Sequence, residues 1–178
     1  MGKKDVYEVM DNLRARVSSE EYIYIFIVNY YLSRMLKTNS LDEILERFED
    51  ENIKYTIRSI YEGNNNYLEQ FNSIKDFNID EIIEIIGLLS ESIGRRGGGE
   101  HTTVKSVIDL SLELLSLEKE DVLLDVGSGI GTTLLSASKT SDVSGIEINL
   151  ESYEISCILL ELFDIPIEDI MHKDVFTY

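Results

Sequence analysis

Cysteine and proline each occur only once in this chain of 178 residues, as Cys157 and Pro166, and tryptophan is absent. A single cysteine excludes a disulfide framework and a cysteine-rich zinc site, and it favours a reducing, cytoplasmic compartment. The two histidines, His101 and His172, are too few and too far apart in the sequence to predict a metal site. Cys157 lies in an apolar stretch at helical spacing, so we expect it to be a core residue.

Basic residues are also scarce. The chain has 16 Lys and Arg against 34 Asp and Glu, which gives a formal net charge of −18. Proteins whose binding depends on many phosphate contacts carry a basic patch, so this charge argues against nonspecific binding to polyanions. Any contact with DNA must come from a small local patch or from another chain. The 43% of hydrophobic and 28% of charged residues are ordinary values for a globular protein.

Long apolar runs are missing as well. The apolar stretch over residues 22–36 is interrupted by Asn29 and Arg34, and it is too short to cross a bilayer. We therefore expect a buried helix there and no association with a membrane. The first residues of the chain open no apolar run, which argues against a signal peptide.

Capping signals predict a helical domain over residues 1–93. A serine or asparagine is followed three residues later by a glutamate at three places, namely residues 18–21, 40–43 and 78–81. Gly63 and Gly94 stand where helices would end, and residues 63–66 indicate a loop. The tyrosines of residues 22–31 suit core packing better than stacking on nucleic-acid bases, because the surroundings are acidic.

A glycine-rich segment over residues 94–99 divides the chain. It contains four glycines with Arg95 and Arg96, and it predicts a linker between the helical domain and a second domain over residues 100–178. The alternative is a mobile loop whose arginines contact phosphates or a partner.

The second domain begins with the pattern of a strand, a glycine turn and a helix. Residues 122–126 are an apolar run, residues 127–131 read Gly-Ser-Gly-Ile-Gly, and residues 132–137 predict the start of a helix. A second strand is predicted over residues 143–148. It contains Glu147, which lies 20 residues after Gly127, where an acid can accept both hydroxyls of a ribose. This pattern predicts an open α/β sheet with a nucleoside site at one edge.

Two residues indicate which ligand this turn binds. A dinucleotide fingerprint needs glycine or alanine at position 132, where this chain has Thr132. Asp125 lies two residues before the first glycine, where its carboxylate would repel a pyrophosphate but attract a cationic amino group. S-adenosylmethionine carries an ammonium group, a ribose and an adenine, so Asp125 and Glu147 together favour it over NAD.

The segment over residues 125–132 resembles the first motif of class I S-adenosylmethionine-dependent methyltransferases. The resemblance implies that Asp125, Gly127, Ser128 and Gly129 contact the cofactor. It also implies that Glu147 binds the ribose, with Ile148 beside it. Residues 169–176 indicate a third strand that runs into a turn, in which Asp174 resembles the acid that accepts from the adenine amino group, with Val175 beside the ring.

A finer resemblance lies upstream, over residues 99–115. Gly99 to Val104, followed by an amphipathic helix, resembles the Gly-x-x-x-Thr-Pro segment of adenine-specific DNA methyltransferases of type I restriction–modification systems. In that family the segment lines the methionyl end of the cofactor, which implies this role for Thr103. The chain departs from the family at Val104, which replaces the proline. Thr103 has a second interpretation, as the N-cap of the helix that follows.

The catalytic motif of that family is absent from these residues. Adenine methylation requires an Asn-Pro-Pro-aromatic or Asp-Pro-Pro-aromatic motif, and the only proline here is Pro166. We therefore predict no catalytic residue, and expect that this chain alone is catalytically incomplete as a fragment, a truncated product or one part of a split enzyme. The expected fold is a helical N-terminal domain followed by the first half of a doubly wound, Rossmann-like methyltransferase sheet.

The resemblance implies particular partners. These are DNA, contacted through the complete enzyme, and the specificity and restriction subunits of a type I system. Half a sheet would also expose the edge of its third strand, which invites self-association. Two alternatives stay open: a methyltransferase for a small molecule, a protein or RNA, and a noncatalytic interaction module that uses the sheet as a scaffold.

Overall fold

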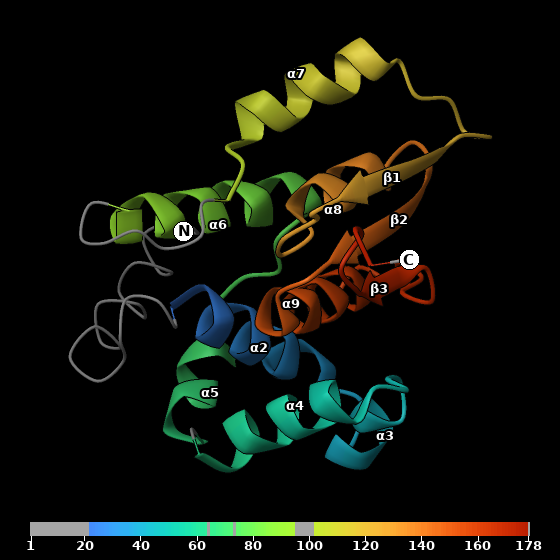
Figure 1. Ribbon diagram of the computed structural model, residues 1–178. Coiled ribbons are helices and arrows are strands. Elements are labelled where there is room, and N and C mark those ends of the chain that lie inside the picture. Colours follow the sequence, from blue (N-terminus) through green and yellow to red (C-terminus); the bar gives the residue numbers. More distant parts are fainter. Residues whose placement is uncertain (1–21, 64, 73, 95–101, 178) are drawn as a thin grey trace. The chain divides into compact units, whose positions relative to one another are not determined.

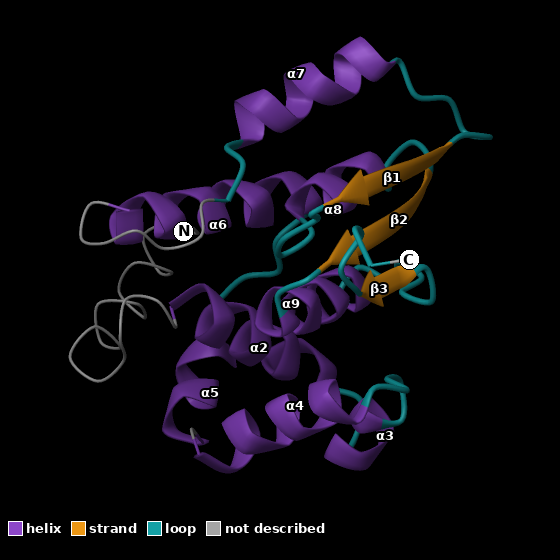
Figure 2. Ribbon diagram, in the orientation of Figure 1, coloured by secondary structure: helices purple, strands orange, loops and turns teal. Residues whose placement is uncertain are grey.

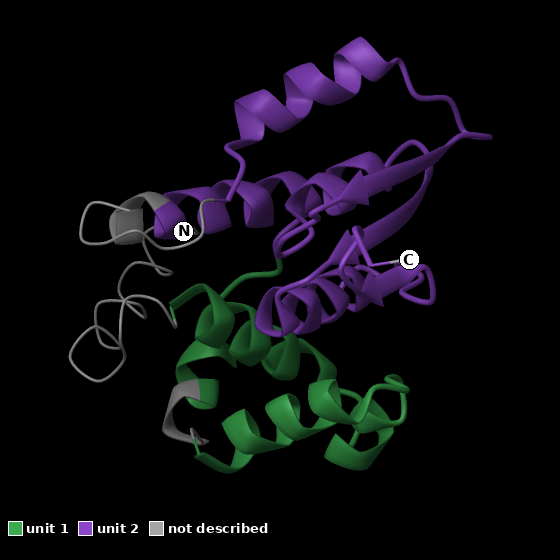
Figure 3. Ribbon diagram, in the orientation of Figure 1, with its two compact units in different colours: residues 1–76 green, residues 77–178 purple. Residues whose placement is uncertain are grey.

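The computed structural model describes residues 22–63, 65–72, 74–94 and 102–177, and the chain forms two compact units that meet in sequence at Asp76 and Phe77 (Figures 1 and 3). This division precedes the one that the sequence predicts at residues 93 and 94. The helix over residues 79–94 belongs to the second unit because it packs against two helices of that unit. The predicted linker residues 95–99 and the capping signal at residues 18–21 lie outside the described residues.

The first unit is helical, as the sequence predicts (Figure 2). Its described elements are α2 (Tyr22–Met35), α3 (Leu41–Leu45), α4 (Glu51–Gly63) and α5 (Asn65–Asn72). The expected loop over residues 63–66 is wrong in part, because α5 already begins at Asn65.

Aromatic side chains of α2 form much of the core of the first unit. Phe26 packs on Phe71 of α5, with ring centroids 5.8 Å apart, and Tyr31 meets the edge of Phe48 at 6.0 Å. All four rings are buried to 1% exposure or less. The tyrosine-rich stretch therefore serves packing, as the sequence predicts for Tyr31.

The capping box at Ser40 is present in full. The Ser40 hydroxyl accepts from the Glu43 N–H at 3.3 Å, and the Glu43 carboxylate accepts from the Ser40 N–H at 2.7 Å. Hydrogen bonds from the backbone and the hydroxyl of Ser40 hold the pKa of Glu43 below its ordinary value. A second reciprocal pair starts α6, where Asn78 accepts from the Glu81 N–H at 2.9 Å and Glu81 accepts from the Asn78 N–H at 3.1 Å.

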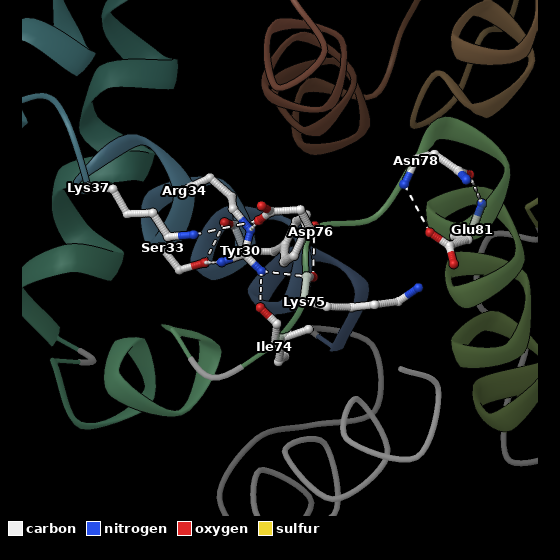
Figure 4. A network of polar contacts seen from close by, with 9 residues as sticks. All are labelled: Tyr30, Ser33, Arg34, Lys37, Ile74, Lys75, Asp76, Asn78 and Glu81. Carbon is white, nitrogen blue, oxygen red and sulfur yellow. Dashed lines mark hydrogen bonds and ion pairs between the residues drawn. The ribbon is translucent and has the colours of Figure 1, made fainter. Parts of the chain in front are cut away.

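The end of the first unit is held by Arg34 of α2 (Figure 4). Its guanidinium donates to the carbonyls of Ile74 and Lys75, and its Nε lies 2.6 Å from Asp76. The same guanidinium lies over the ring of Tyr30, 4.4 Å from the centroid. One planar, largely buried cation therefore fixes the last residues before the second unit.

The second unit contains a parallel sheet with helices packed on it. Its elements are α6 (Ile79–Gly94), α7 (Lys105–Leu115), β1 (Val122–Val126), α8 (Thr132–Ala137), β2 (Asp142–Glu147), α9 (Leu150–Glu161) and β3 (Ile170–His172). The strand order is β1-β2-β3, with Asp125 opposite Gly145 and Glu147 opposite His172. Helices α8 and α9 pack on the strands, and Cys157 of α9 is buried in this core, as expected.

An ion cluster ties three helices of this unit together. The Asp80 carboxylate of α6 lies 2.9 Å from the Lys139 ammonium, just after α8, and 3.1 Å from the Lys105 ammonium of α7. Hydrogen bonds from Lys139 and then Lys105 lower the pKa of Asp80.

Among the described residues, no helix is both long and apolar enough to cross a membrane.

Candidate cofactor site

The glycine turn after β1 has a backbone that only glycine adopts easily. Gly127, Gly129 and Gly131 have φ angles of +80°, +54° and +79°, all in the left-handed region. A side chain with a Cβ is strained there, so the alternation of glycines in the sequence follows directly from the path of the backbone. The turn leads from the end of β1 into α8, whose N-cap is Gly131.

The three glycines differ in what surrounds them. A Cβ added at Gly127 or Gly129 would meet no atom within 4 Å, so both positions face open space. A Cβ added at Gly131 would lie 2.4 Å from the Ser156 Oγ of α9. Gly127 and Gly129 therefore leave bare backbone that a ligand can approach, whereas Gly131 allows α8 and α9 to pack closely.

The turn is held in place by the end of β2. The N–H groups of Gly127 and Ser128 both donate to the carbonyl of Ile146, at 2.8 and 3.1 Å. The next N–H, that of Gly129, donates to the Glu147 carboxylate at 2.6 Å. Three successive N–H groups of the turn thus donate to the end of β2.

Glu147 is a buried acid at the carboxyl end of β2. Its side chain is 7% exposed, and its second carboxylate oxygen accepts from the Asn149 N–H at 2.7 Å. Asn149 in turn caps α9 by accepting from the Ser152 N–H at 2.9 Å. The carboxylate therefore connects the glycine turn to the start of α9.

Asp125 lies near the end of β1 and interacts with Glu147. Burial raises the pKa of Asp125, and the negative charge of Glu147 raises it further. Two carboxylates at adjacent strand ends form a site that a cation would stabilise, because a positive charge relieves their repulsion.

Asp174 follows β3 and stands next to the Glu147 backbone. The Lys173 N–H donates to the Glu147 carbonyl at 2.8 Å, which places residue 174 directly after this contact. The Asp174 Oδ1 accepts from the Phe176 N–H at 2.9 Å, which closes a small turn. The structure therefore brings Asp125, Glu147 and Asp174 to the carboxyl ends of three neighbouring strands, the edge at which open α/β sheets bind ligands.

Two solved structures that the chain resembles are described as methyltransferases. A candidate class I S-adenosylmethionine-dependent methyltransferase from Listeria monocytogenes matches with a TM-score of 0.56 and 15% identity, over 97% of this chain and 53% of that chain. The methyltransferase subunit of a type I restriction–modification system from Streptococcus thermophilus matches with a TM-score of 0.58 and 16% identity, over 99% of this chain and 60% of that chain. The fold is that of a methyltransferase. This result confirms the predicted fold class, and the chain spans less than two thirds of either structure.

No protein-family model and no curated protein matches the sequence. At this level of identity, the likeness to the two structures establishes the fold alone. The function must therefore be argued from the residues of the site.

The residues of this methyltransferase fold suit S-adenosylmethionine chemically. Asp125 and Glu147 provide negative charge for a ligand that carries an ammonium and a sulfonium group, and the open space at Gly127 and Gly129 would admit the ligand close to the backbone. Ile148 is 63% exposed directly after Glu147, where an apolar side chain can cover a base. Val175 is half-buried after Asp174.

Ser128 is a buried residue of the glycine turn. Its side chain is 7% exposed, and its Oγ would lie 3.1 Å from a Cβ placed at Gly145 of β2. The hydroxyl thus lies beneath the turn, against the sheet. Any contact that Ser128 makes with a ligand in this arrangement would use its backbone.

Thr103 is exposed and lies two residues before α7. The N-cap of α7 is Val104, and it makes no side-chain capping bond, so the interpretation of Thr103 as the N-cap is wrong. No hydrogen bond within the described residues joins Thr103 to the glycine turn. The predicted amphipathic helix is present as α7, although only its Ile108 is buried. The role of Thr103 stays a prediction.

Three polar residues near the site were not singled out by the sequence. Asn149 links Glu147 to α9, and Ser156 sets how closely α9 approaches Gly131. Tyr153 stacks on His172 with ring centroids 5.5 Å apart, and the His172 Nε2 lies 3.0 Å from the Ile148 carbonyl. The Asn149 N-cap is the only one of these with a local signal, a polar residue directly before a helix.

Within the described part of the chain, no three His, Cys, Asp or Glu side chains could together hold a metal ion, and His101 lies outside that part.

Proposed function

We propose that this chain binds S-adenosylmethionine at the carboxyl edge of its sheet, as the cofactor-binding part of a DNA adenine methyltransferase of a restriction–modification system. One observation carries the cofactor assignment. The glycine turn leaves open space at Gly127 and Gly129 beside two acids at adjacent strand ends, and one of those acids, Asp125, has a raised pKa. A pyrophosphate would add negative charge to this place, whereas S-adenosylmethionine adds positive charge.

The proposed contacts follow the chemistry of the ligand. Asp125 attracts the methionyl ammonium, Glu147 accepts from the ribose hydroxyls, and Asp174 accepts from the adenine amino group. Ile148 and Val175 cover the two sides of the base, the backbone of Gly127, Ser128 and Gly129 lies along the cofactor, and Thr103 closes the methionyl end. When bound, S-adenosylmethionine supplies a methyl group activated by its sulfonium, so the contribution of the protein is orientation.

The DNA assignment is supported by the likeness to the methyltransferase subunit from Streptococcus thermophilus and by the resemblance of residues 99–115. We propose that the complete enzyme contacts DNA and that specificity and restriction subunits are its partners. The net charge of −18 agrees with a chain that leaves most phosphate contacts to other polypeptides. We also propose that this chain does not methylate DNA alone, because the Asn-Pro-Pro-aromatic or Asp-Pro-Pro-aromatic motif is missing from its residues.

Self-association through a sheet edge belongs to the same proposal. In the described residues the sheet ends at β1 on one side and at β3 on the other. We expect the edge of β3, where Met171 is 41% exposed, to pair with a second copy. Light scattering at micromolar concentrations tests this, and a monomeric mass at every concentration would count against it.

Titration calorimetry with S-adenosylmethionine tests the cofactor assignment. We expect the native chain to bind it, and we expect Asp125→Ala and Glu147→Ala to weaken binding by about tenfold or more, the effect of losing a hydrogen bond to a charged group. Asp142→Ala is the matched control, because Asp142 is exposed at the opposite end of β2. A folded native chain that binds no S-adenosylmethionine would reject the assignment and favour a noncatalytic interaction module.

Transfer of a labelled methyl group separates the remaining possibilities. We expect no label on DNA after incubation of the purified chain with labelled cofactor. Label on DNA would contradict the proposed incompleteness. Label on RNA or protein instead would identify a methyltransferase for another substrate.

A further inference from the structure

Glu147 makes two hydrogen bonds that need no ligand. One carboxylate oxygen accepts from the Gly129 N–H at 2.6 Å and the other accepts from the Asn149 N–H at 2.7 Å. These donors belong to different loops, the glycine turn after β1 and the short connection between β2 and α9. One side chain therefore spans both loops in the free chain.

The position of Gly129 makes this contact important for the shape of the turn. Gly127 and Ser128 already donate to the Ile146 carbonyl, so the backbone of Ile146 holds the first half of the turn. Gly129 is the next residue, its φ is +54°, and no protein atom lies near the place of its missing Cβ. The bond to Glu147 holds the N–H of the peptide that joins Ser128 and Gly129, and the carbonyl of the same peptide accepts from the Gly131 N–H at 3.0 Å.

We propose that Glu147 is a positioning residue, whose carboxylate sets the glycine turn in its ligand-binding shape before any ligand arrives. A carboxylate has about four acceptor positions on two oxygens, and the two loops use one on each. One acceptor position on each oxygen remains, which suits a pair of neighbouring hydroxyl groups. This inference rests on the proposed function only for the identity of the diol; the positioning of the turn is a property of the free chain.

The substitution Glu147→Gln tests this idea with little change in shape. The Gly129 and Asn149 N–H groups bond to different oxygens of Glu147, and a glutamine replaces one of those oxygens by an NH₂ donor, so in the same position it can accept from only one of them. We expect the amide hydrogen of at least one of these residues to exchange with solvent about tenfold faster or more, because a hydrogen bond to a charged group is lost. The measurement is amide exchange by NMR on the full chain without cofactor.

One reference amide and one control substitution make the result specific. The Gly145 N–H donates to the Asp169 carbonyl at 3.1 Å within the same sheet, so general loss of stability would speed exchange at Gly145 as well. Glu120→Gln is the matched control substitution, because Glu120 is exposed in the turn before β1. We expect the exchange of Gly145 to stay unchanged in Glu147→Gln, and all three amides to stay unchanged in Glu120→Gln.

A measurement on the native chain covers the case in which Glu147→Gln does not fold. A scalar coupling transmitted through the hydrogen bond, from the Gly129 nitrogen to the Glu147 carboxyl carbon, reports the contact directly. Detection of this coupling supports the inference, and its absence at the bond length seen here overturns it.

Calorimetry with S-adenosylmethionine on the same samples separates this inference from the proposed function. If the native chain binds no S-adenosylmethionine while Glu147→Gln speeds exchange at Gly129 or Asn149, the proposed function fails and the positioning role stands. If Glu147→Gln weakens binding while both amides exchange as in the native chain, Glu147 acts only as a ligand contact and the inference is overturned.

Discussion

Asp125 is a residue at which ligand binding and stability oppose each other. Its raised pKa shows that the folded chain disfavours the charged carboxylate, through burial first and repulsion from Glu147 second. A group whose acid form is favoured by folding lowers stability once it ionises. This loss in the free energy of unfolding is absent below the ordinary pKa of about 3.9. It grows as the pH rises toward the raised pKa of Asp125 and is constant above that pKa.

We therefore expect Asp125→Asn to stabilise the free chain at pH 7 and to weaken cofactor binding. The gain in the free energy of unfolding should be below about 1 kcal/mol, because the site is partly open to solvent, and it should raise the Tm by a few degrees. Thermal unfolding at pH 7 and at pH 3.5 measures both the gain and its loss in acid. Asp142→Asn is the control, and an equal gain from it, or a gain at Asp125 that persists at pH 3.5, would contradict this account.

Gly129 and Gly131 serve different purposes in the turn. Gly129 leaves open space for a ligand, and Gly131 makes room for Ser156 of α9. Gly129→Ala meets no atom, so we expect only the cost of left-handed backbone, about 1–2 kcal/mol, together with weaker cofactor binding. Gly131→Ala adds a collision with Ser156, and the total should be about 2–5 kcal/mol. Urea unfolding measures both variants. Adding Ser156→Ala should recover part of the loss in Gly131→Ala and none in Gly129→Ala, and equal recovery in both would show that Ser156 is not the obstacle.

At the scale of elements, the start of α6 depends on a pair of reciprocal hydrogen bonds. Asn78 and Glu81 each accept from the backbone N–H of the other. We expect Asn78→Ala to lower the free energy of unfolding by about 1 kcal/mol, the usual cost of removing an N-cap. Asn52→Ala, an exposed position inside α4, should be neutral or slightly stabilising, because alanine is the better helix former. An equal loss in both variants, measured by urea unfolding, would show that the cap at Asn78 contributes nothing.

The elements that the sequence predicts best are those with local causes. The capping pairs at Ser40 and Asn78 depend on residues three positions apart, and the strand, turn and helix at residues 122–137 depend on one continuous pattern. The start of α5 at Asn65 was missed, because its asparagines are typical of a loop. The bond from Gly129 to the Glu147 carboxylate joins residues 18 positions apart, so the sequence placed Glu147 at the site but could not show that contact.

At the scale of the whole molecule, the two compact units raise the question of whether they unfold together. Arg34 offers a way to answer, since its contacts all lie within the first unit. Its guanidinium holds the Ile74 and Lys75 carbonyls and the Asp76 carboxylate, directly before the division at residues 76 and 77. A lysine keeps the charge but cannot make these several bonds at once, because it lacks the planar fork.

We expect Arg34→Lys to lower the free energy of unfolding of the first unit by about 1–3 kcal/mol, the range for losing hydrogen bonds to a buried charge. Hydrogen exchange measured on peptides should then speed up over residues 22–72 and stay unchanged over residues 122–172. Lys37→Ala is the control in the same network, because the Lys37 ammonium lies 3.6 Å from Asp76 and is half-exposed, so its loss should cost little. If exchange in the sheet rises as much as exchange in the helices, the two units unfold as one. The stability of the cofactor site would then depend on the helical unit, and substitutions there would weaken cofactor binding without any contact with the ligand.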